Sequence, residues 1–526
     1  GVANVGFYGV SATPSTTYQG SFYAKAGAAL STVVRVTLEK SDGTVIAGTN
    51  VRNAVGADWH KSTFTIRTPA GITASTDNRV VVSLVGAAGG QDVWLSEVSL
   101  FPPTFKNRPN GVRPDIATKL ANLHLGLFRV PGGNYLEGNT LATRFAWKNT
   151  IGPVEQRPGH QNTAWGYWST DGFGILEFLR LAEDIGAQPL LALFAGYTLN
   201  GQHVSESDYG AYIQDALDEI QYAIGDTSTP WGARRAADGH PKPFDLRYVE
   251  VGNEDWFDSS GSYAWRFSRM YDAVKSAYPQ LKVIATTGGY QGGAASSTAT
   301  GTTPDLVDDH YYNPPAWFSD NSARYDRVDR NGPQVLVGEY GGIDGSPTGT
   351  LRAAVGEAAF LTGLERNSDI VIGSMYAPVI VHEGQPNWPT NLIGIDAGSS
   401  YGSPSYWVQQ MFSTNLGAQV VGARLTGAGS IKEVVTRTVH DGVTTLYVKI
   451  VNPTSQIQSA RLSFFGVRSV NDSGALIQLT GDPSARNTLA TPTAIVPQTR
   501  RVTGLGTVSR LTVPPNSVTV LRVTAR

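Results

Sequence analysis

The fold of this chain is decided by the stretch Leu246-Arg-Tyr-Val-Glu-Val-Gly-Asn-Glu-Asp-Trp256. Its first half alternates β-branched and aromatic residues with others, which predicts a short buried strand ending at Gly252. Asn253 and Glu254 follow at the C-terminal tip of that strand, where a β/α barrel builds its active site. The alternative is a helix N-cap, because Asn or Asp after a strand commonly opens a helix and Asp255 could fill that role by itself.

A second stretch has the same order of residues. Gln334-Val-Leu-Val-Gly-Glu-Tyr-Gly-Gly342 reads as a strand, then Gly338, then Glu339. Two glutamates at two strand tips form the carboxyl pair that glycoside hydrolysis needs, and in retaining enzymes the two groups lie about 5 Å apart. We expect Glu254 to be the acid/base, because the amide of Asn253 beside it can hold the sugar 2-hydroxyl. Glu339 is then the expected nucleophile.

The composition excludes several classes of function. A chain of 526 residues is too long for one core, so several domains are expected. The net charge is -2 and no basic run is present, which argues against nucleic acid and anionic membranes as partners. The absence of cysteine excludes disulfides and a thiol nucleophile, and no apolar run is long enough to span a bilayer. A low charged content with 51 aromatic residues (Trp 11, Tyr 22, Phe 18) suits a neutral carbohydrate ligand.

The N-terminal region, residues 1–101, reads as short alternating segments separated by Gly, Pro and Asp, which predicts an all-β jelly-roll that is carbohydrate-binding-like. Its rings at Tyr18, Trp59 and Trp94 are expected to pack in the core or against the next domain, and sugar binding is the alternative. The chain opens at Gly1 without a signal-like segment, so we expect a processed product of a secreted, extracellular protein.

Residues 102–410 alternate apolar runs with helical periodicity, which predicts an α/β fold of the (β/α)8 TIM-barrel type. Seven strand-like runs are found rather than eight: 125–133, 188–196, 246–254, 282–289, 306–313, 334–342 and 369–378. We expect the missing first strand to come from an N-terminal peptide of the same precursor, held as a separate chain. The alternative is that residues 93–101 serve as the first strand. Residues 411–526 return to strand patterns and predict a C-terminal β-sandwich.

Two further strand tips carry polar residues. His310-Tyr-Tyr312 ends one run, and a tyrosine hydroxyl there could hold Glu339 as a carboxylate. His310 could equally be a buried histidine with satisfied hydrogen bonds. A metal is not expected because only one histidine is local, and no cofactor is predicted. Pro131-Gly-Gly-Asn134 ends another run; its glycines allow a tight turn that points Asn134 into the barrel mouth, unless it is a plain turn.

Longer motifs give a specific resemblance. They are Leu127-Phe-Arg-Val-Pro-Gly-Gly-Asn-Tyr-Leu-Glu-Gly-Asn139, Ile151-Gly-Pro with Arg157-Pro158, Trp165-Gly-Tyr-Trp-Ser-Thr-Asp-Gly172, Val249-Glu-Val-Gly-Asn-Glu-Asp-Trp256 and Tyr401-Gly-Ser-Pro-Ser-Tyr406. Together they resemble glycoside hydrolase family 51, the α-L-arabinofuranosidase family of clan A, in its branch with an N-terminal carbohydrate-binding-like domain. The likeness covers nearly the whole chain.

The resemblance implies site residues and an activity. Glu254 matches the acid/base and Glu339 the nucleophile, while Asn134, Asn253, Trp165 and Tyr312 match positions that line the furanoside pocket. The implied enzyme is a retaining, exo-acting α-L-arabinofuranosidase that trims arabinose branches from plant cell-wall arabinoxylan, arabinan or arabino-oligosaccharides.

Two departures and two alternatives accompany this assignment. The family's chain begins with a strand that carries a substrate-contacting glutamate, and Gly1 falls after that point. The family's Asn-rich loop reads Val381-His-Glu-Gly-Gln-Pro-Asn-Trp388 here. The alternatives are a retaining endo-glucanase or xylanase of the same clan, and a non-catalytic carbohydrate-binding protein.

Overall fold

The computed structural model describes residues 1–52, 54–86, 90–286, 301–427 and 430–526. The chain divides into two compact units. The first comprises Gly1–Thr118 with Ile395–Ser400, and the second comprises Lys119–Gly394 with Tyr401–Arg526. Over the described ranges, no helix has the length and apolar character needed to cross a bilayer.

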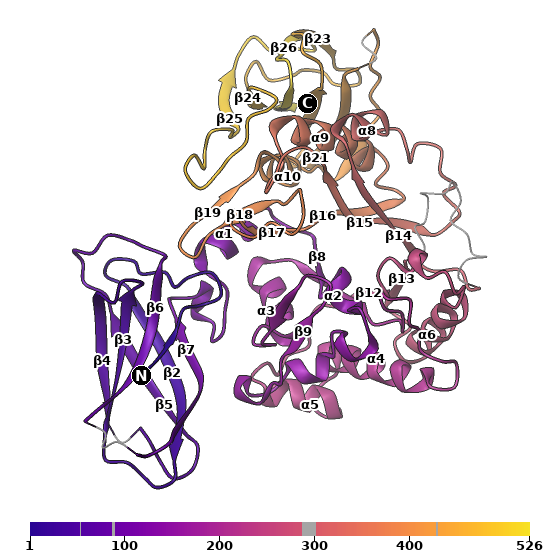
Figure 1. Ribbon diagram of the computed structural model, residues 1–526. Coiled ribbons are helices and arrows are strands. Elements are labelled where there is room, and N and C mark those ends of the chain that lie inside the picture. The colour runs from indigo at the N-terminus through magenta and orange to yellow at the C-terminus, as the bar shows by residue number, and fades with distance from the viewer. Residues whose placement is uncertain (53, 87–89, 287–300, 428–429) are drawn as a thin grey trace. The chain divides into compact units, whose positions relative to one another are not determined.

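The first unit contains two antiparallel sheets around one core (Figure 1). One sheet has the strand order β1-β6-β3-β4 and the other β5-β2-β7. Alternate residues of each strand, such as Phe22 and Phe64, point into the shared core, as the period of two predicts. The strands are β1 (Val2–Asn4), β2 (Thr17–Ala26), β3 (Val33–Lys40), β4 (Val45–Arg52), β5 (His60–Arg67), β6 (Asn78–Val85) and β7 (Val93–Phe101).

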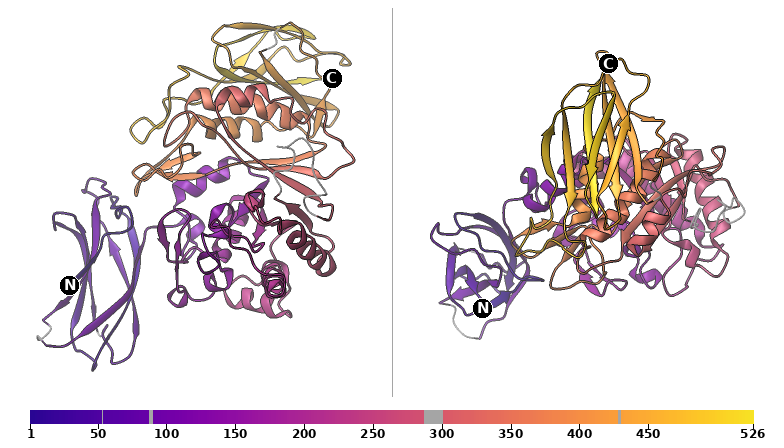
Figure 2. Two further views of the ribbon diagram at one scale, coloured as in Figure 1. Left: turned by 45° about the vertical axis from the view of Figure 1, so that its right-hand side comes forward. Right: turned by 90° about the horizontal axis from the view of Figure 1, so that it is seen from above.

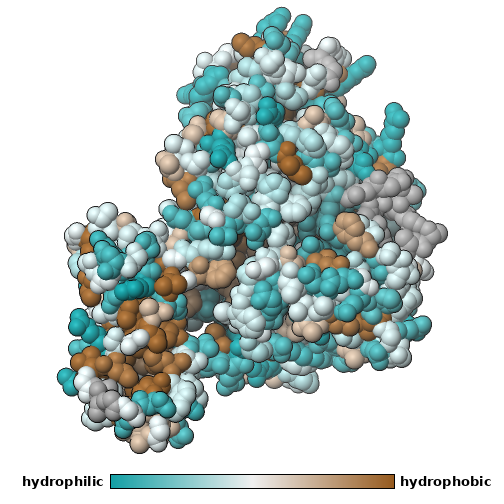
Figure 3. Space-filling model, viewed as in Figure 1, coloured by the Kyte–Doolittle hydropathy of each residue, from teal (hydrophilic) through white to brown (hydrophobic). Residues whose placement is uncertain are grey.

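Two predictions about this unit can be compared with the structure. β7 pairs antiparallel with β2, so residues 93–101 belong to this sheet, as expected, and the alternative in which they form the first barrel strand is wrong. Tyr18 is buried as expected, but Trp59 and Trp94 do not pack in the core, since each is 47% exposed. Other hydrophobic side chains of the unit also gather on the face seen in Figure 3.

The second unit is organised around a parallel sheet of seven strands in the order β16-β15-β14-β13-β12-β11-β8. These strands coincide with the seven predicted runs, although 287–289 of the fourth run lie outside the described residues. They are β8 (Leu127–Val130), β11 (Gln188–Leu193), β12 (Tyr248–Val251), β13 (Lys282–Ala285), β14 (Leu306–Asn313), β15 (Gln334–Gly342) and β16 (Val371–Tyr376). The result is a nearly closed, barrel-like α/β sheet.

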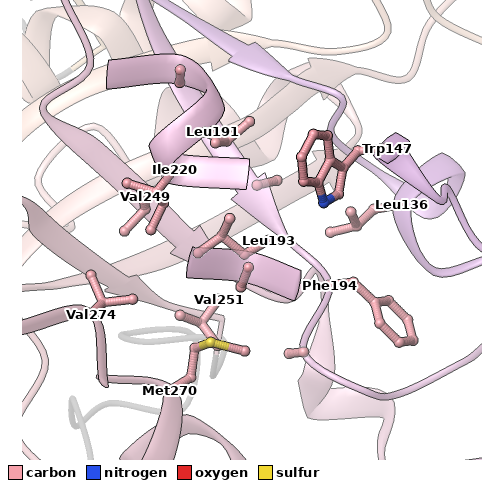
Figure 4. Packing of buried hydrophobic residues seen from close by; sticks show 14 of the residues in the cluster. Leu136, Trp147, Leu191, Leu193, Phe194, Ile220, Val249, Val251, Met270 and Val274 are labelled. Atoms are coloured by element: carbon pink, nitrogen blue, oxygen red, sulfur yellow. The ribbon is translucent and has the colours of Figure 1, made fainter. Parts of the chain in front are cut away.

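Helices between the strands cover the outside of the sheet. Leu191 and Leu193 of β11 and Val251 of β12 pack against helix side chains such as Ile220 and Met270 (Figure 4). Each buried side chain of this size contributes about 1.5–3 kcal/mol. The helices of this unit are α2 (Asn134–Glu137), α3 (Ile175–Ile185), α4 (Tyr209–Ile224), α5 (Pro230–Ala237), α6 (Tyr263–Ala277), α8 (Pro315–Asp320), α9 (Leu351–Arg366) and α10 (Pro404–Ser413), while α1 (Pro114–Asn122) lies where the two units join in sequence.

The C-terminal strands form a separate layer, with α9 between them and the barrel strands β15 and β16 (Figures 1 and 2). A six-stranded antiparallel sheet, β20-β21-β22-β27-β24-β25, shares a core with the two-stranded antiparallel sheet β23-β26. A buried ion pair between Lys449 of β22 and Glu365 ties this sheet to α9. The strands are β20 (Gln419–Val421), β21 (Lys432–His440), β22 (Val443–Asn452), β23 (Gln458–Ser463), β24 (Gly474–Thr480), β25 (Gln498–Val502), β26 (Val508–Val513) and β27 (Ser517–Ala525).

Short elements complete the connections. They are η1 (Phe105–Asn107), η2 (Leu141–Thr143), η3 (Trp147–Thr150), η4 (Val154–Gln156), η5 (Asp255–Phe257), β9 (His160–Asn162), β10 (Tyr167–Ser169), β17 (Ile380–His382), β18 (Ile393–Ile395) and β19 (Ser400–Gly402).

Candidate active site

The interior of the barrel has an apolar floor followed by a charged layer. Leu127, Tyr248 and Leu306 belong to the apolar cluster at the floor. Side chains two residues apart lie on the same face of a strand. The next layer toward the C-terminal tips therefore consists of the charged residues Arg129, Glu250 and Asp308. Both carboxylates of this layer are fully buried and contact other side chains of the barrel, Arg129 and His310 respectively.

A glycine makes room for this layer. Gly338 of β15 lies beside Asp308, and a Cβ at Gly338 would lie 2.2 Å from Asp308 Oδ1. The backbone N–H of Gly338 donates to the same oxygen at 2.7 Å. Burial raises the pKa of Asp308, but the neighbouring His310 and other donors outweigh it, so the pKa of Asp308 is lowered. Asp308 is therefore ionised beneath the site.

Glu254 has an unusual backbone conformation at the tip of β12, which ends at Val251, one residue before the predicted Gly252. Its φ of 49° lies in the left-handed region, which is strained for a residue with a side chain. Glu254 stands at the N-cap position of η5 but makes no side-chain cap. The Asp255 carboxylate instead accepts from the Asn253 N–H at 3.1 Å, and this frees the Glu254 carboxyl to face the barrel mouth.

Glu339 lies on the neighbouring side of the mouth, on β15. The register pairs His310 of β14 with Glu339. Arg129 donates to Glu339 Oε1 at 2.9 Å, and the Tyr312 hydroxyl donates to Oε2 at 2.8 Å. A fixed cation and a phenol therefore contact the two oxygens of this carboxylate, as an ionised nucleophile requires. The tyrosine contact is the one expected from the His310-Tyr-Tyr312 segment.

His310 connects the two glutamates. Its Nδ1 lies 2.8 Å from Glu254 Oε1 and 3.5 Å from Glu339 Oε2, and its Nε2 lies 2.7 Å from Asp308 Oδ2. Burial by itself lowers the pKa of His310, but the carboxylates of Asp308 and Glu339 raise it well above its usual value. The imidazole is therefore a cation with both nitrogens donating. His310 is buried with both ring nitrogens hydrogen-bonded, and it also contacts both glutamates of the pair.

The separation of the two glutamates limits the chemistry. Carboxyl oxygens of Glu254 and Glu339 lie within 4.8 Å of each other. The side chains are 18% and 12% exposed, unlike the buried charged layer below them. A pair this close matches the spacing of about 5 Å in retaining glycosidases and is too close for the water of an inverting one, which needs about 6.5–9.5 Å.

The amide of Asn253 is fixed by three partners. Its Oδ1 accepts from Arg129 at 2.8 Å, and its Nδ2 donates to Asn134 Oδ1 at 3.2 Å and Glu137 Oε2 at 2.9 Å. Both amide protons are thus used, and one lone pair of Oδ1 is left to accept from a ligand hydroxyl. Burial, with some repulsion from Asp255, raises the pKa of Glu137 well above its usual value.

Aromatic rings line one side of the mouth. The ring of Trp388 meets Tyr312 edge-on at 5.0 Å between centroids and Trp165 at 6.1 Å. Asn387 donates its side-chain amide to the backbone oxygen of Trp165 at 3.1 Å. The indole N–H of Trp388 is buried and has no hydrogen-bond partner within the described ranges, so it is available to a ligand oxygen. Trp165 therefore contacts Trp388, and Trp388 contacts the site residue Tyr312. Trp388 belongs to the loop 381–388, which departs from the family's pattern.

The predicted residues Asn134, Asn253, Glu254, His310, Tyr312 and Glu339 are brought together, and Trp165 lies at the edge. Sequence reasoning missed Arg129, Glu137 and Trp388. A signal existed for Arg129, because a charged residue inside a short apolar run must point into the barrel or away from it. The N–H group of Trp388 and the carboxylate of Glu137 gave no comparable signal.

The cluster does not suit a cation. Glu254, His310 and Glu339 have the atom types and spacing of metal ligands. However, Arg129 already places a positive charge 2.9 Å from Glu339, and both nitrogens of His310 face carboxylates. A metal ion would have to displace these contacts and would be repelled by the guanidinium.

Comparison with known proteins agrees with this geometry. The family model for the α-L-arabinofuranosidase 1 domain matches residues 119–330, and the model for the α-L-arabinofuranosidase C-terminal domain matches residues 338–517. α-L-Arabinofuranosidase 2 of Arabidopsis thaliana is 33% identical over 505 residues, which cover 95% of this chain and 72% of that protein. The chain belongs to the α-L-arabinofuranosidases of glycoside hydrolase family 51. It is therefore a glycoside hydrolase.

Other α-L-arabinofuranosidases are similarly related. A probable α-L-arabinofuranosidase A of Aspergillus terreus is 34% identical, with 99% of this chain and 81% of that protein covered. An extracellular exo-α-L-arabinofuranosidase of Streptomyces chartreusis is 35% identical, with 84% and 55% covered, so the chain spans little more than half of that relative. A solved arabinose-bound family 51 α-L-arabinofuranosidase, MgGH51, superposes with a TM-score of 0.92 at 38% identity, covering 100% of this chain and 85% of that one.

Proposed function

We propose that this family 51 chain is an exo-acting, retaining enzyme that releases terminal α-L-arabinofuranosyl side chains from arabinoxylan, arabinan or arabino-oligosaccharides. The observation that carries the mechanism is the separation of at most 4.8 Å between carboxyl oxygens of Glu254 and Glu339. This spacing leaves room for one anomeric carbon between the carboxyl groups and favours double displacement over direct attack by water.

In the first step Glu339 attacks the anomeric carbon while Glu254 gives its proton to the glycosidic oxygen, which leaves with the aglycone. A covalent arabinosyl ester on Glu339 results. In the second step Glu254 takes a proton from water, and the water oxygen attacks the anomeric carbon and releases Glu339 as a carboxylate. Two inversions give net retention of configuration.

The surroundings of each glutamate support these roles. Arg129 and Tyr312 hold the two oxygens of Glu339, which keeps the nucleophile oriented. The His310 cation donates to Glu254 and lies near Glu339, so it stabilises whichever carboxylate carries the negative charge during the cycle. We assign His310 a place in the site as a bridge between the two glutamates.

Substrate contacts are assigned to groups that can still accept a hydrogen bond or contact a sugar with an aromatic ring. Asn253 Oδ1 retains one lone pair and is proposed to accept the sugar 2-hydroxyl, with Asn134 holding the amide in place. Trp165 and Trp388 are proposed to contact the sugar or the leaving group at the side of the mouth formed by Tyr312. No metal or cofactor is required for these steps.

We further propose the finer architecture as residues 1–101 forming a jelly-roll, 102–410 an eight-stranded (β/α)8 barrel and 411–526 a β-sandwich. Two sheets around one core support the first and third assignments. The parallel sheet ends at β8 and β16, which approach each other, but no ladder joins them within the described ranges. Because unpaired edges inside a barrel are costly, an N-terminal peptide of the same precursor is proposed as the first strand.

Intact-mass analysis of the active protein under denaturing conditions tests this partner. A companion peptide beside the chain of 56.1 kDa is expected, or an upstream segment joined to it. A fully active preparation that contains only this chain would contradict the proposal. An extracellular location is proposed from the extracellular Streptomyces relative.

The activity is tested with a panel of aryl α-L-arabinofuranosides, β-xylosides and β-glucosides, together with arabinoxylan and linear xylan. We expect turnover of the arabinofuranoside, free arabinose from arabinoxylan, and an unchanged main-chain length. Proton NMR of the first-formed product should show the α-anomer. Shortening of linear xylan would favour the endo-acting alternative, and no turnover of any substrate would favour a carbohydrate-binding protein.

A further inference from the structure

A row of aromatic side chains crosses the outer face of the three-stranded sheet in the first unit. The register pairs Lys25 of β2 with Trp94 of β7, and Ala24 with His60 of β5, which places Trp59 on the other side of Lys25. The Lys25 ammonium lies 5.0 Å from the Trp59 ring centroid and 5.5 Å from that of Trp94. The two half-exposed indoles thus flank one amino group.

The neighbouring cross-strand rows on this face carry another ring beside a lysine, followed by polar side chains. Tyr23 lies two residues before Lys25 on the same face, and the Lys61 ammonium is 5.4 Å from its ring centroid. Hydroxyl and amide side chains follow along the same face: Ser21, Thr63, Ser96, Ser99, Gln19 and Thr65. Residues between them, such as Phe22 and Phe64, point into the core. This face therefore combines exposed rings with hydrogen-bonding groups and carries no aliphatic side chain in these rows.

A hollow of about 530 Å³ adjoins the row at Trp59. It is lined by the apolar side chains of Leu30 and Val55 and by the polar side chains of Asp58 and His60. A volume in this range is typical of ligand sites, and an apolar wall with a few polar groups is their usual lining. The Trp59 indole is thus beside a concave surface, and the cation–π contacts with Lys25 hold both indoles in place before a ligand arrives.

We propose that this outer face of sheet β5-β2-β7 is a second carbohydrate site, which binds the pyranosyl main chain of an uncharged polysaccharide. Trp59 and Trp94 stack on the apolar faces of sugar rings, and Lys25 donates hydrogen bonds to hydroxyls between them. A pyranose chair presents a broad, flat C–H face to an indole, whereas a puckered furanose presents a smaller one. The site thus differs in ligand from the catalytic pocket of the other unit.

The chemistry of the face disfavours other ligands. A protein partner is disfavoured because interface cores are depleted in lysine and serine, and both residue types recur in these rows. A polyuronate would be attracted by Lys25 and Lys61 but repelled by Asp58 at the hollow. A neutral chain can use the rings and hydroxyls without opposing any charge.

Affinity electrophoresis of the full chain in gels containing unsubstituted β-1,4-xylan tests the proposal, because this ligand has no arabinosyl group for the catalytic pocket. Wild-type protein should be retarded, and Trp59→Ala or Trp94→Ala should weaken retention about tenfold, as expected for loss of a central aromatic contact. Trp59→Tyr should retain part of the binding. Phe7→Ala is the matched control, since Phe7 is an exposed ring (66%) of the same unit outside this sheet.

Turnover of an aryl arabinofuranoside should be unchanged in all four variants, which shows that the fold is intact. Binding to xylan is measured without catalysis, so its outcome is independent of the proposed activity. Retention that survives both Trp→Ala changes, or is lost equally in Phe7→Ala, would overturn the assignment. So would stronger retention in polygalacturonate or linear arabinan than in xylan, or no retention of an active wild type.

Discussion

The contact between Tyr312 and Glu339 gives the sharpest mutational prediction. The Tyr312→Phe change removes one O–H donor 2.8 Å from Glu339 Oε2 and keeps the ring that packs on Trp388. A hydrogen bond to a charged group contributes about 1.5–3 kcal/mol. Because each 1.36 kcal/mol corresponds to a tenfold change in rate, kcat/KM should fall about ten- to a hundredfold.

The loss should be mainly in kcat. Arg129 still holds Oε1 of Glu339, so the carboxylate remains in the site. Oε2, however, loses its donor and is drawn to His310 Nδ1, which is 3.5 Å away. This rotation turns the nucleophile from the anomeric carbon without removing a group that binds the sugar. KM should therefore change less than kcat.

The assay is steady-state hydrolysis of an aryl α-L-arabinofuranoside, with thermal unfolding measured in parallel. Tyr311→Phe is the matched control, because its hydroxyl donates to Asp309 at 2.8 Å and does not contact Glu339. This control should lower stability and leave kcat within about twofold of wild type. A Tyr312→Phe enzyme with unchanged kcat/KM, or equal losses in both variants, would refute the reasoning.

Three further predictions concern the acid/base, a buried glutamate of α9 and the glycine beside Asp308. Glu254→Ala should abolish release of arabinose from arabinoxylan but spare activated aryl arabinosides, with partial rescue by azide; equal rates on both substrates would contradict its role. Burial raises the pKa of Glu357 from 4.5 to about 7, so the folded state keeps a proton that the unfolded state releases, and stability falls as pH rises through this window. The free energy of unfolding of Glu357→Gln, measured by calorimetry, should thus be about 3 kcal/mol higher than that of wild type at pH 8. The two proteins should be equally stable at pH 4. Gly338→Ala should destabilise by about 3 kcal/mol and inactivate, because its Cβ would meet Asp308, whereas Gly126→Ala, with nothing within 4 Å of the added Cβ, should be mild.

The barrel could be predicted from the sequence because each of its strands is a short apolar run ending in glycine or a polar residue. The same pattern of an apolar run followed by a polar residue predicted the positions of Glu254 and Glu339, because the C-terminal tips of parallel strands meet at one edge of the sheet. The alternation of residues 93–101 also predicted that β7 belongs to the N-terminal β unit, although it did not identify β2 as the partner strand. These features depend on local patterns, which the chain displays directly.

Other features depend on which surfaces meet, and the local pattern does not contain that information. Arg129 interrupts an apolar run, yet only the assembled barrel shows that it contacts both Glu339 and Asn253. Trp59 and Trp94 do not pack in the core, which was one of the two places predicted for them, because a ring on or beside an alternating strand can face either side of its sheet. The left-handed conformation of Glu254 was not predictable, since surrounding contacts impose it.

The central claim is that Glu339 attacks the sugar while Glu254, within 4.8 Å, supplies and recovers the proton. It is tested most directly by trapping the covalent intermediate with a 2-deoxy-2-fluoro arabinofuranosyl inactivator and mapping the labelled peptide by mass spectrometry. The account predicts one arabinosyl ester, on Glu339, formed in wild type and prevented by an excess of arabinose. A label on Glu254 or another residue, or steady turnover with no trapped ester and an inverted product, would contradict it.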